Sequence, residues 1–254
     1  MSTFSWRFIR MWQRNRDVFL RLWHAEAPGF VAEPVLVLLA MGLGLWAYVG
    51  MVDGQKYIEY IVPGIIASYG MFSASFECTY GSYYRMEERK TYDAIIATPL
   101  NVEDVIAGEI FWGATRSFIT GSVVLIVAAI FQLVPSPWAL LIPILSFLGG
   151  VLFSSIAILY TSLVPSFYSF NYYFTLFITP MFFFSGVFFP LSNFPEIVQR
   201  ISLIIPLTPV VTISRALVSG EFRLDLLLSL VIIIVLSILF FSISLVTMRR
   251  RLTV

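Results

Sequence analysis

The chain has 254 residues, of which 59% are hydrophobic and only 12% are charged, and its net charge is +1. Soluble domains carry about a quarter charged residues, so this composition excludes an ordinary soluble domain and favours a membrane protein. A single cysteine and a single histidine exclude a disulfide framework and a cysteine–histidine metal cluster.

The first predicted element is a basic amphipathic helix over residues 4–27. One stripe at helical spacing is basic: Arg7, Arg10, Arg14 and Arg21. A second face carries aromatic and leucine side chains, a pattern typical of a helix lying in the inner headgroup layer. The simpler alternative is that these basic residues act only as a positive-inside signal that orients the chain in the membrane. The long apolar run begins too late for a cleaved signal peptide, so we expect the segment to be retained.

Six apolar runs follow, and none alternates as a β-barrel strand would. Each is near the about 20 residues that a transmembrane helix needs. We predict spans over 29–50, 58–82, 104–131, 138–163, 169–190 and 226–248. Pro28 and Pro34 predict a bend into the first span, and Pro180 and Gly186 allow a break in the fifth. The expected fold class is an all-α integral membrane protein with one domain over residues 1–254.

The placement of positive charge predicts the orientation of these spans. Most of the sixteen Lys and Arg residues lie before the first span, between the second and third, or after the sixth. Since positive residues gather on the cytoplasmic side, we expect both termini and the segment 83–103 in the cytoplasm.

The charged segment "RMEERKTYDAIIATPLNVEDVIAGE", residues 85–109, interrupts the apolar sequence. The spacing predicts a short helix over 86–98 with Tyr92, Ile95 and Ile96 on one face and charged side chains on another. The segment is either a solvated loop helix or an element that docks into a cytoplasmic protein.

A second short element is predicted over 192–206, between the fifth and sixth spans. It begins with a polar Ser-Asn pair, carries Pro195 in its first turn and ends at Pro206. About a dozen residues are too few to cross a bilayer, so we expect an interfacial or re-entrant helix on the outer face. A surface loop helix is the plainer alternative.

Ionisable residues within spans are costly and are candidates for function. The third span carries Glu109 and Arg116, seven residues apart and therefore on one face. Glu77 lies at a similar depth on the neighbouring antiparallel helix, and Glu33 lies in the first span. We favour an interhelical salt bridge, in which either Glu77 or Glu109 pairs with Arg116, over a proton relay.

The fifth predicted span is unusually aromatic. Aromatic belts at the two interfaces, together with packing, are the favoured explanation. A role in lining a substrate path is the alternative, because aromatic faces can stack on sugar rings or lie along acyl chains. The candidates for that path are Tyr172, Tyr173, Phe174, Phe177 and Phe183.

Three features carry a family resemblance. "ERKTYDAIIATPLNVEDVIAGE" and "SGVFFPLSNFPEIVQRISLIIPLTPVV" resemble the cytoplasmic helix and the outer-face segment of type-2 ABC exporter permeases, and the six-span layout is the third feature. Together they cover nearly the whole chain. The nodulation-factor and polysaccharide export permeases are the most similar group. One departure is Pro209, where many relatives carry a histidine after "PLT" or "PLS", so no role of that histidine is transferred.

The resemblance implies a homodimer with two copies of a separate ABC ATPase, which would bind ATP and Mg. This chain has no G-x-x-x-x-G-K-[ST] phosphate-binding loop, so ATP hydrolysis would lie on the partner and no cofactor is expected here. The cytoplasmic helix would be the coupling element, with these candidate residues: Glu87, Glu88, Arg89, Lys90, Tyr92, Asp93, Ile95 and Ile96. Tyr92, Ile95 and Ile96 would anchor it in the ATPase.

The sequence therefore predicts the permease subunit of an ATP-driven exporter in the bacterial cytoplasmic (inner) membrane. Its substrate would be amphiphilic: a lipid-linked glycan, a lipo-oligosaccharide, a lipid or a hydrophobic drug. Membrane lipids are expected partners and nucleic acid is not. A proton-coupled secondary transporter is one alternative, weakened because no twofold repeat of broken helices is visible. A lipid-modifying membrane enzyme is another, weakened because the single histidine, His24, allows no nucleophile–base set within the membrane.

Overall fold

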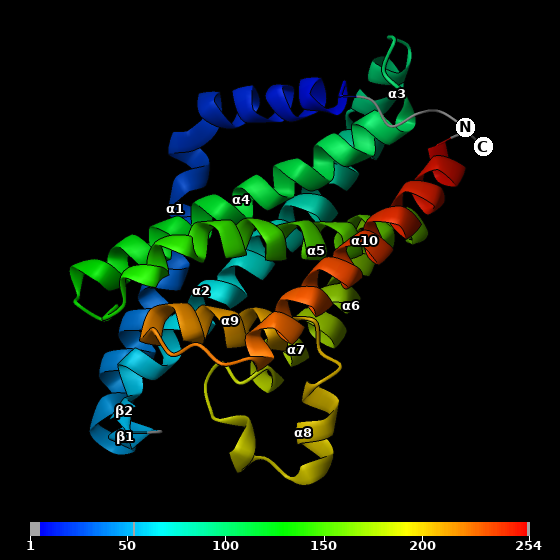
Figure 1. Cartoon of the computed structure of the whole chain (residues 1–254). Helices are drawn as coiled ribbons and strands as arrows, with labels where there is room; N and C mark the ends of the chain where they lie inside the picture. The colour runs from blue at the N-terminus through cyan, green and yellow to red at the C-terminus, as the bar shows by residue number, and fades with distance from the viewer. Residues whose placement is uncertain (1–5, 53, 253–254) are drawn as a thin grey trace.

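The computed structural model describes residues 6–52 and 54–252, and most of them are helical (Figure 1). The α-helices are α1 Phe8–Val49, α2 Tyr57–Phe76, α3 Thr91–Ile96, α4 Val102–Ile130, α5 Ile142–Leu163, α6 Phe170–Tyr173, α7 Thr179–Phe184, α8 Glu196–Ser202, α9 Leu207–Ser219 and α10 Asp225–Leu252. Strands β1 Met51–Val52 and β2 Gln55–Lys56 form a small antiparallel hairpin. The π-helical turns are η1 Glu77–Gly81, η2 Tyr84–Glu88 and η5 Phe174–Ile178, and the 3-10 turns are η3 Pro137–Leu141, η4 Phe167–Ser169 and η6 Leu191–Asn193.

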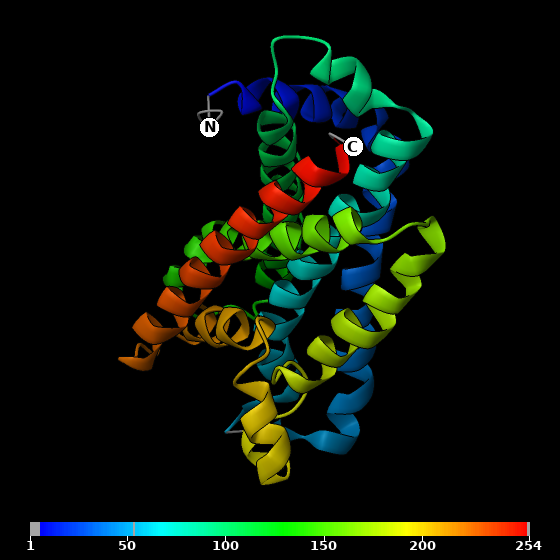
Figure 2. The ribbon, with the colours of Figure 1, turned by 90° about the vertical axis from the view of Figure 1, so that its right-hand side faces the viewer.

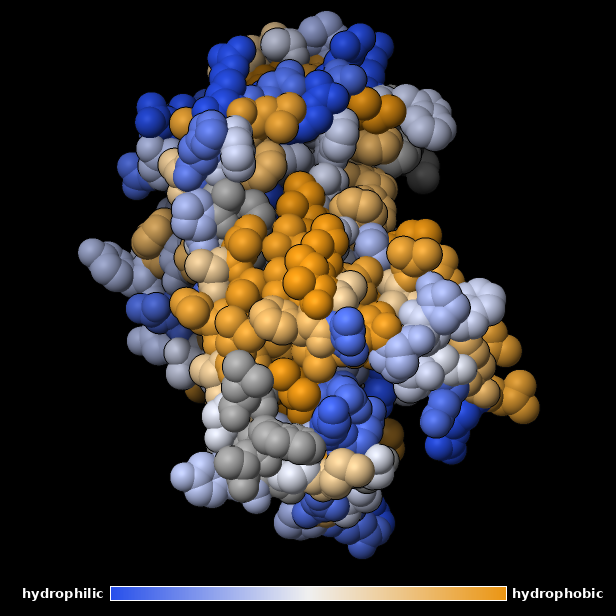
Figure 3. All heavy atoms as spheres, turned by 90° about the vertical axis from the view of Figure 1, so that its left-hand side faces the viewer, coloured by the Kyte–Doolittle hydropathy of each residue, from blue (hydrophilic) through white to orange (hydrophobic). Residues whose placement is uncertain are grey.

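Four helical stretches are long and apolar enough to cross a membrane, and two bent helix pairs would raise the number to six. The four stretches are Tyr57–Glu88, Val102–Ile130, Pro137–Leu163 and Asp225–Leu252. Figure 3 shows hydrophobic side chains across the middle of one face, with hydrophilic side chains gathered toward both ends. This distribution matches a bilayer-spanning bundle and confirms the all-α membrane class.

Helix α1 combines the predicted amphipathic segment and the first span in one helix with a bend. Its parts Phe8–Glu26 and Val31–Met41 meet at 49°, with Pro28 between them. Pro28 lacks the backbone N–H that would continue the helical ladder, which accounts for a kink at this position. Figure 1 shows the first part lying across one end of the bundle before the chain turns along it. Residues 4 and 5 of the predicted element lie outside the described residues.

The fifth predicted span, 169–190, differs from the structure. Its helical part ends at Phe184, and the chain turns at Gly186, whose φ is +76°. The stretch Phe170–Phe184 is about 22 Å long at 1.5 Å per residue, and the adjoining 3-10 turn η4 extends it toward the about 30 Å of a hydrocarbon core. A positive φ suits glycine and ends the helix, so the helical part of this element is shorter than predicted.

The outer-face element predicted over 192–206 is also different in the structure. Only α8 falls within it, and Pro206 is the residue before a second helix, α9, which the sequence analysis missed. The pair α8–α9 is bent by 86°, the geometry of a broken span or a re-entrant loop. Pro209 lies in the first turn of α9, where proline is tolerated, so it does not exclude a helix there.

Helices α4 and α5 approach closely because small residues meet at their crossing. A Cβ added at Gly150 of α5 would lie 2.7 Å from the Cα of Ala114 on α4. One added at Gly113 of α4 would lie 2.3 Å from Oγ of Ser154 on α5. Within a membrane, such small residues let helix backbones come together and pack.

The two ends of the bundle carry different elements. The start of α1, helix α3 and the end of α10 lie at one end, whereas the β-hairpin and α8 lie at the other (Figures 1 and 2). The basic residues Arg249, Arg250 and Arg251 are in the last turn of α10 and therefore lie at the α3 end. This arrangement brings the basic segments of the sequence together.

Candidate functional site

A buried row of ion pairs links α1, the end of α2, and α4. Arg85 of η2 lies 2.8 Å from Glu77 of η1 and donates from Nε to Oε1 of Glu109 on α4 at 2.9 Å. Arg116 of α4 contacts Glu26 of α1, and its Nε lies 3.7 Å from Glu77. Positive and negative side chains therefore alternate, in the order Glu109, Arg85, Glu77, Arg116 and Glu26.

Glu109 is the most enclosed member of this row, with a fully buried side chain. Besides Arg85, its carboxylate accepts hydrogen bonds from Nδ2 of Asn15 on α1 at 3.2 Å and from Oγ of Ser82 at 2.8 Å. A buried charge is tolerated when it is paired and hydrogen-bonded in this way. The contacts support the salt-bridge interpretation of these residues and give no specific support to a proton relay.

The pairing pattern differs from the one expected from the sequence. Glu77 does contact Arg116, but Glu109 pairs with Arg85, which had been assigned to a cytoplasmic loop. The reason is that α2 continues through η1 and η2 as far as Glu88, so Arg85 remains on the helix. Its spacing of eight residues from Glu77 is a helical-face spacing that could have indicated the pair.

Beside this row lies a groove of about 1030 Å³ between α1, α2 and α4. Its α1 side includes residues spaced about one turn apart: Arg14, Val18, Leu22, Glu26, Gly29 and Glu33. Its other sides include Tyr69, Phe72, Phe76, Tyr80 and Tyr84 from the α2 stretch, Trp112 and Arg116 from α4, and Phe174 from η5. The groove is thus polar in some parts and aromatic in others.

The aromatic wall of the groove comes mainly from α2. The ring of Tyr80 stacks on that of Phe174 at 5.6 Å, and the ring of Phe76 lies 4.6 Å from Tyr80. The α2 residues were not predicted from the sequence, although Tyr69, Phe72, Phe76 and Tyr80 recur at helical spacing.

Only one of the five path residues proposed from the sequence lines this groove. Phe174 does, whereas Tyr173 is 1% exposed and shares a hydrogen bond with the Ser75 hydroxyl in the core. Tyr172, Phe177 and Phe183 are each more than half exposed. Tyr173 is therefore not on a path in this structure, because packing encloses its side chain.

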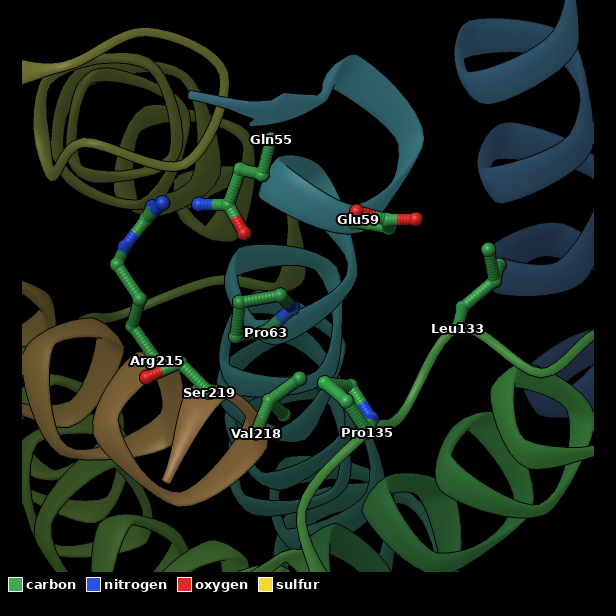
Figure 4. Close-up of a pocket in the computed structure, with 8 residues that line it drawn as sticks. All are labelled: Gln55, Glu59, Pro63, Leu133, Pro135, Arg215, Val218 and Ser219. Atoms are coloured by element: carbon green, nitrogen blue, oxygen red, sulfur yellow. The ribbon is translucent and has the colours of Figure 1, made fainter. Parts of the chain in front are cut away.

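A smaller cavity of about 210 Å³ lies near the β-hairpin (Figure 4). Figure 4 shows Arg215 of α9 and Gln55 of β2 extending toward each other across it. Arg215 donates to the carbonyl oxygens of Gly186 at 2.7 Å and Tyr60 at 3.3 Å, and it lies 3.8 Å from the centre of the Tyr60 ring. Arg215 therefore ties α9 to α2 and to the turn after α7.

The predicted coupling helix, 86–98, is shorter in the structure. Residues up to Glu88 belong to the end of the α2 stretch, and Lys90 has a left-handed φ of +48°, so α3 begins only at Thr91. Tyr92 is 1% exposed inside the permease. Burial and the nearby negative charge of Glu109 raise the pKa of its phenol well above the ordinary value. Tyr92 therefore anchors α3 to its own chain and is not available to a partner.

The remaining coupling candidates divide by exposure. Ile95 and Ile96 are half-buried and pack against the permease core. Glu87 is bound by Arg251 of α10 at 2.9 Å and by Lys90 at 3.3 Å. The exposed candidates are Glu88, Arg89, Lys90 and Asp93. These four residues form what we call the α3 charged surface.

The multi-span helical bundle, its apolar belt and its amphipathic groove define a membrane protein of the transport class. The chain belongs to the ABC-2 type transporter family, which matches residues 6–219. It is thus a permease of the type-2 ABC exporter kind, a transporter membrane subunit rather than an enzyme.

Known relatives cover most of the chain. Nodulation protein J of Sinorhizobium fredii (strain NBRC 101917 / NGR234) is 36% identical over 211 residues, or 83% of this chain and 80% of the relative. Nodulation protein J of Rhizobium meliloti (strain 1021) is 33% identical over 251 residues, 98% of this chain and 95% of the relative. The inner membrane transport permease YadH of Escherichia coli (strain K12) is 22% identical over 197 residues, 78% and 77% of the two chains.

Proposed function

We propose that this permease moves an amphiphilic substrate out of the cytoplasm, driven by ATP that a separate ATPase chain binds with Mg. The observation that carries the proposal is the groove, which combines charged side chains and an aromatic wall within one space of about 1030 Å³. The polar head of an amphiphile would contact the charged side chains, and its apolar tail would pack on the aromatic wall. Since this chain has no phosphate-binding loop, the energy would come from the partner's preference for one permease conformation when ATP is bound.

The proposed assembly is a homodimer of this chain with two copies of the ATPase. The groove is lined by α1, the α2 stretch, α4 and η5 of one chain, so two copies could place two grooves along a shared path. The six-span arrangement and the α8–α9 pair as a re-entrant outer segment belong to the same proposal. It is supported by the four long apolar stretches, by the bent α1 as the first span and by the 86° bend between α8 and α9. The helical stretch that ends before Gly186 would be the fifth span.

The proposed orientation places both termini and α3 in the cytoplasm, because most basic residues lie at that end of the bundle. A reporter fused after Val254 or inserted at Lys90 is expected to be active only as a cytoplasmic reporter. One inserted at Asn193 is expected to be active only as an extracytoplasmic reporter. A Val254 fusion on the outer side would contradict the orientation.

The proposed ATPase docking surface consists of Glu88, Lys90 and Asp93 of the α3 charged surface, together with the exposed side of α3. The Arg89 side chain instead contacts Tyr84 at the edge of the groove. Tyr92 fixes this helix to the permease, so a force on its exposed side would be passed to the segment that carries Arg85. That segment is connected through ion pairs to α4 and through Glu109 and Asn15 to α1. Movement of the ATPase would in this way reach the helices that border the groove.

Reversing two exposed charges tests this docking surface. The double variant Glu88→Lys, Asp93→Lys places positive charge where a partner would meet negative charge, and like-charge contacts cost several kcal/mol. We expect copurification of the proposed ATPase partner to weaken about tenfold or more, since a factor of ten is about 1.4 kcal/mol. Folded permease yield should not change, because both side chains are exposed.

Glu221→Lys is the matched control, because Glu221 is also exposed but lies shortly before α10, at the opposite end of that helix from its basic last turn. This control should bind the ATPase normally. Normal ATPase binding by the double variant would place the docking surface elsewhere.

A further inference from the structure

The groove carries two arginines that the ion-pair row does not use. Arg14 of α1 and Arg89, next to α3, both line the groove. Arg14 donates to Oδ1 of Asn15 at 2.9 Å, and Arg89 donates to the Tyr84 hydroxyl at 2.9 Å and lies 5.4 Å from its ring centre. Among the residues that the structure describes, neither arginine forms an ion pair with a carboxylate.

The acidic residues of the groove are placed differently. Glu26 and Glu77 are already engaged by Arg116 and Arg85. Glu33 accepts a hydrogen bond from the Tyr69 hydroxyl, at the other end of the groove. Tyr69 and Arg89 are twenty residues apart along the α2 stretch, about 30 Å at 1.5 Å per residue. The end of the groove near α3 therefore keeps a positive character.

The part of the groove between these ends is aromatic. Phe72, Phe76, Tyr80 and Phe174 line it, and the rings of Phe76 and Phe174 are 5.6 Å apart. Such a wall offers contact area to an acyl or prenyl chain without requiring hydrogen bonds. Positive charge at one end and an aromatic strip beyond it match an amphiphile with an anionic head.

We propose that Arg14 and Arg89 bind the anionic headgroup of a lipid amphiphile whose chain lies along the aromatic wall of the groove. Arginine suits this role because its planar guanidinium can donate two hydrogen bonds to one phosphate or sulfate. This inference depends on the proposed export function, because it names the class of substrate that the groove would bind. The shared chemistry is the anionic head, and its source is either the exported molecule or a bilayer phospholipid.

The test uses the purified full chain in lipid nanodiscs with a photoreactive phosphatidic acid that carries its crosslinking group in the acyl chain. A diacylglycerol with the same reactive chain serves as the neutral probe. The expected result is that phosphatidic acid labels peptides containing Phe76, Tyr80 or Phe174 at least tenfold more than diacylglycerol does. In the double variant Arg14→Gln, Arg89→Gln this preference should fall about tenfold, because two charge-assisted contacts are lost.

The control variant is Arg10→Gln, Arg250→Gln, which removes two positive charges from the same end of the molecule. Neither Arg10 nor Arg250 lines the groove, so this control should label as the unchanged chain does. Equal labelling by the two probes, an undiminished preference in the Arg14, Arg89 variant, or an equal loss in the control would each overturn the proposal. If the double variant does not fold, Arg89→Gln alone is used, since Arg89 is exposed.

A second arm separates the two sources of the headgroup. The complex with its ATPase is labelled before and after ATP is added. Labelling that falls during ATP turnover would identify exported cargo, whereas unchanged labelling would identify a resident phospholipid, and both outcomes support the anionic site. Because the first arm needs no ATPase, failure of the export proposal would leave its result intact. Failure of headgroup selectivity would leave ATP-driven export untouched.

Discussion

Replacing Arg85 with alanine is expected to destabilise the permease by about 3–5 kcal/mol, the usual cost of breaking a buried ion pair from one side. Arg85 is the partner of both Glu109, which is fully buried, and Glu77. Without it, two carboxylates would remain in the interior with too little positive charge to balance them. The measurement is the midpoint of thermal unfolding, together with the yield of folded protein in detergent.

Two further variants separate the charge effect from lost packing. In Arg85→Ala, Glu109→Gln the uncompensated negative charge is removed, so part of the lost stability should return. Arg85→Lys should be intermediate, because an ammonium cannot donate to two carboxylates with the fixed geometry of a guanidinium. The surface control is Arg200→Ala, which breaks the exposed pair with Glu196 and should cost no more than about 0.5 kcal/mol. An Arg85→Ala effect as small as that of the control would show that the row of ion pairs does not stabilise the fold.

The second large effect is expected at the crossing of α4 and α5. Gly150→Leu would force a side chain against the backbone of Ala114, since even a Cβ would lie only 2.7 Å from its Cα. A backbone atom cannot move aside as a flexible side chain can, so the two helices would have to separate. Overpacking of a core costs about 1–3 kcal/mol or more. We expect loss of folded permease, measured by size-exclusion chromatography after membrane extraction.

The neighbouring glycine provides a sharp control for this prediction. A Cβ at Gly149 would lie 3.4 Å from Cγ1 of Val210, an ordinary contact. Gly149→Ala should therefore leave the protein folded, and Gly150→Ala should already lower its unfolding midpoint. Equal tolerance of alanine at both positions would mean that the close approach of α4 and α5 is not needed for stability.

The long apolar helices were predictable because a continuous apolar run of this length by itself indicates a transmembrane helix. The span predicted over 104–131 corresponds to α4, and that over 226–248 corresponds to α10. Continuous apolar sequence of this length has no other stable arrangement in a bilayer than a helix. The proline bend in α1 was predictable for a similarly local reason, the missing N–H of Pro28.

The broken elements were not predictable, because tertiary contacts decide where they end. The fifth predicted span stops at Phe184, and the turn at Gly186 is held by Arg215 from α9, which is far away in the sequence. No local sequence pattern predicts this contact between distant residues. Helix α9 was missed because its sequence is short and begins with prolines at 206 and 209, which usually indicate turns.

The candidate site was only partly predictable for the same reason. Glu77, Glu109 and Arg116 stood out because charge within an apolar run is rare. Their partners did not, because Arg85 looked like part of a loop and Glu26 like part of a surface helix. The burial of Tyr92 also depends on how α3 folds back onto the permease, which helical spacing cannot reveal.

The most direct measurement of the proposed function is ATP-dependent movement of an amphiphile by the whole complex. The permease and its proposed ATPase partner would be reconstituted into vesicles that contain a fluorescent lipid amphiphile. Transfer of the amphiphile across the bilayer would then be followed with ATP, with a non-hydrolysable analogue and with an imposed proton gradient. Transfer and amphiphile-stimulated hydrolysis that require ATP, and that are lost in the Glu88→Lys, Asp93→Lys variant, are the predicted result. Transfer that follows the proton gradient and ignores ATP would contradict it.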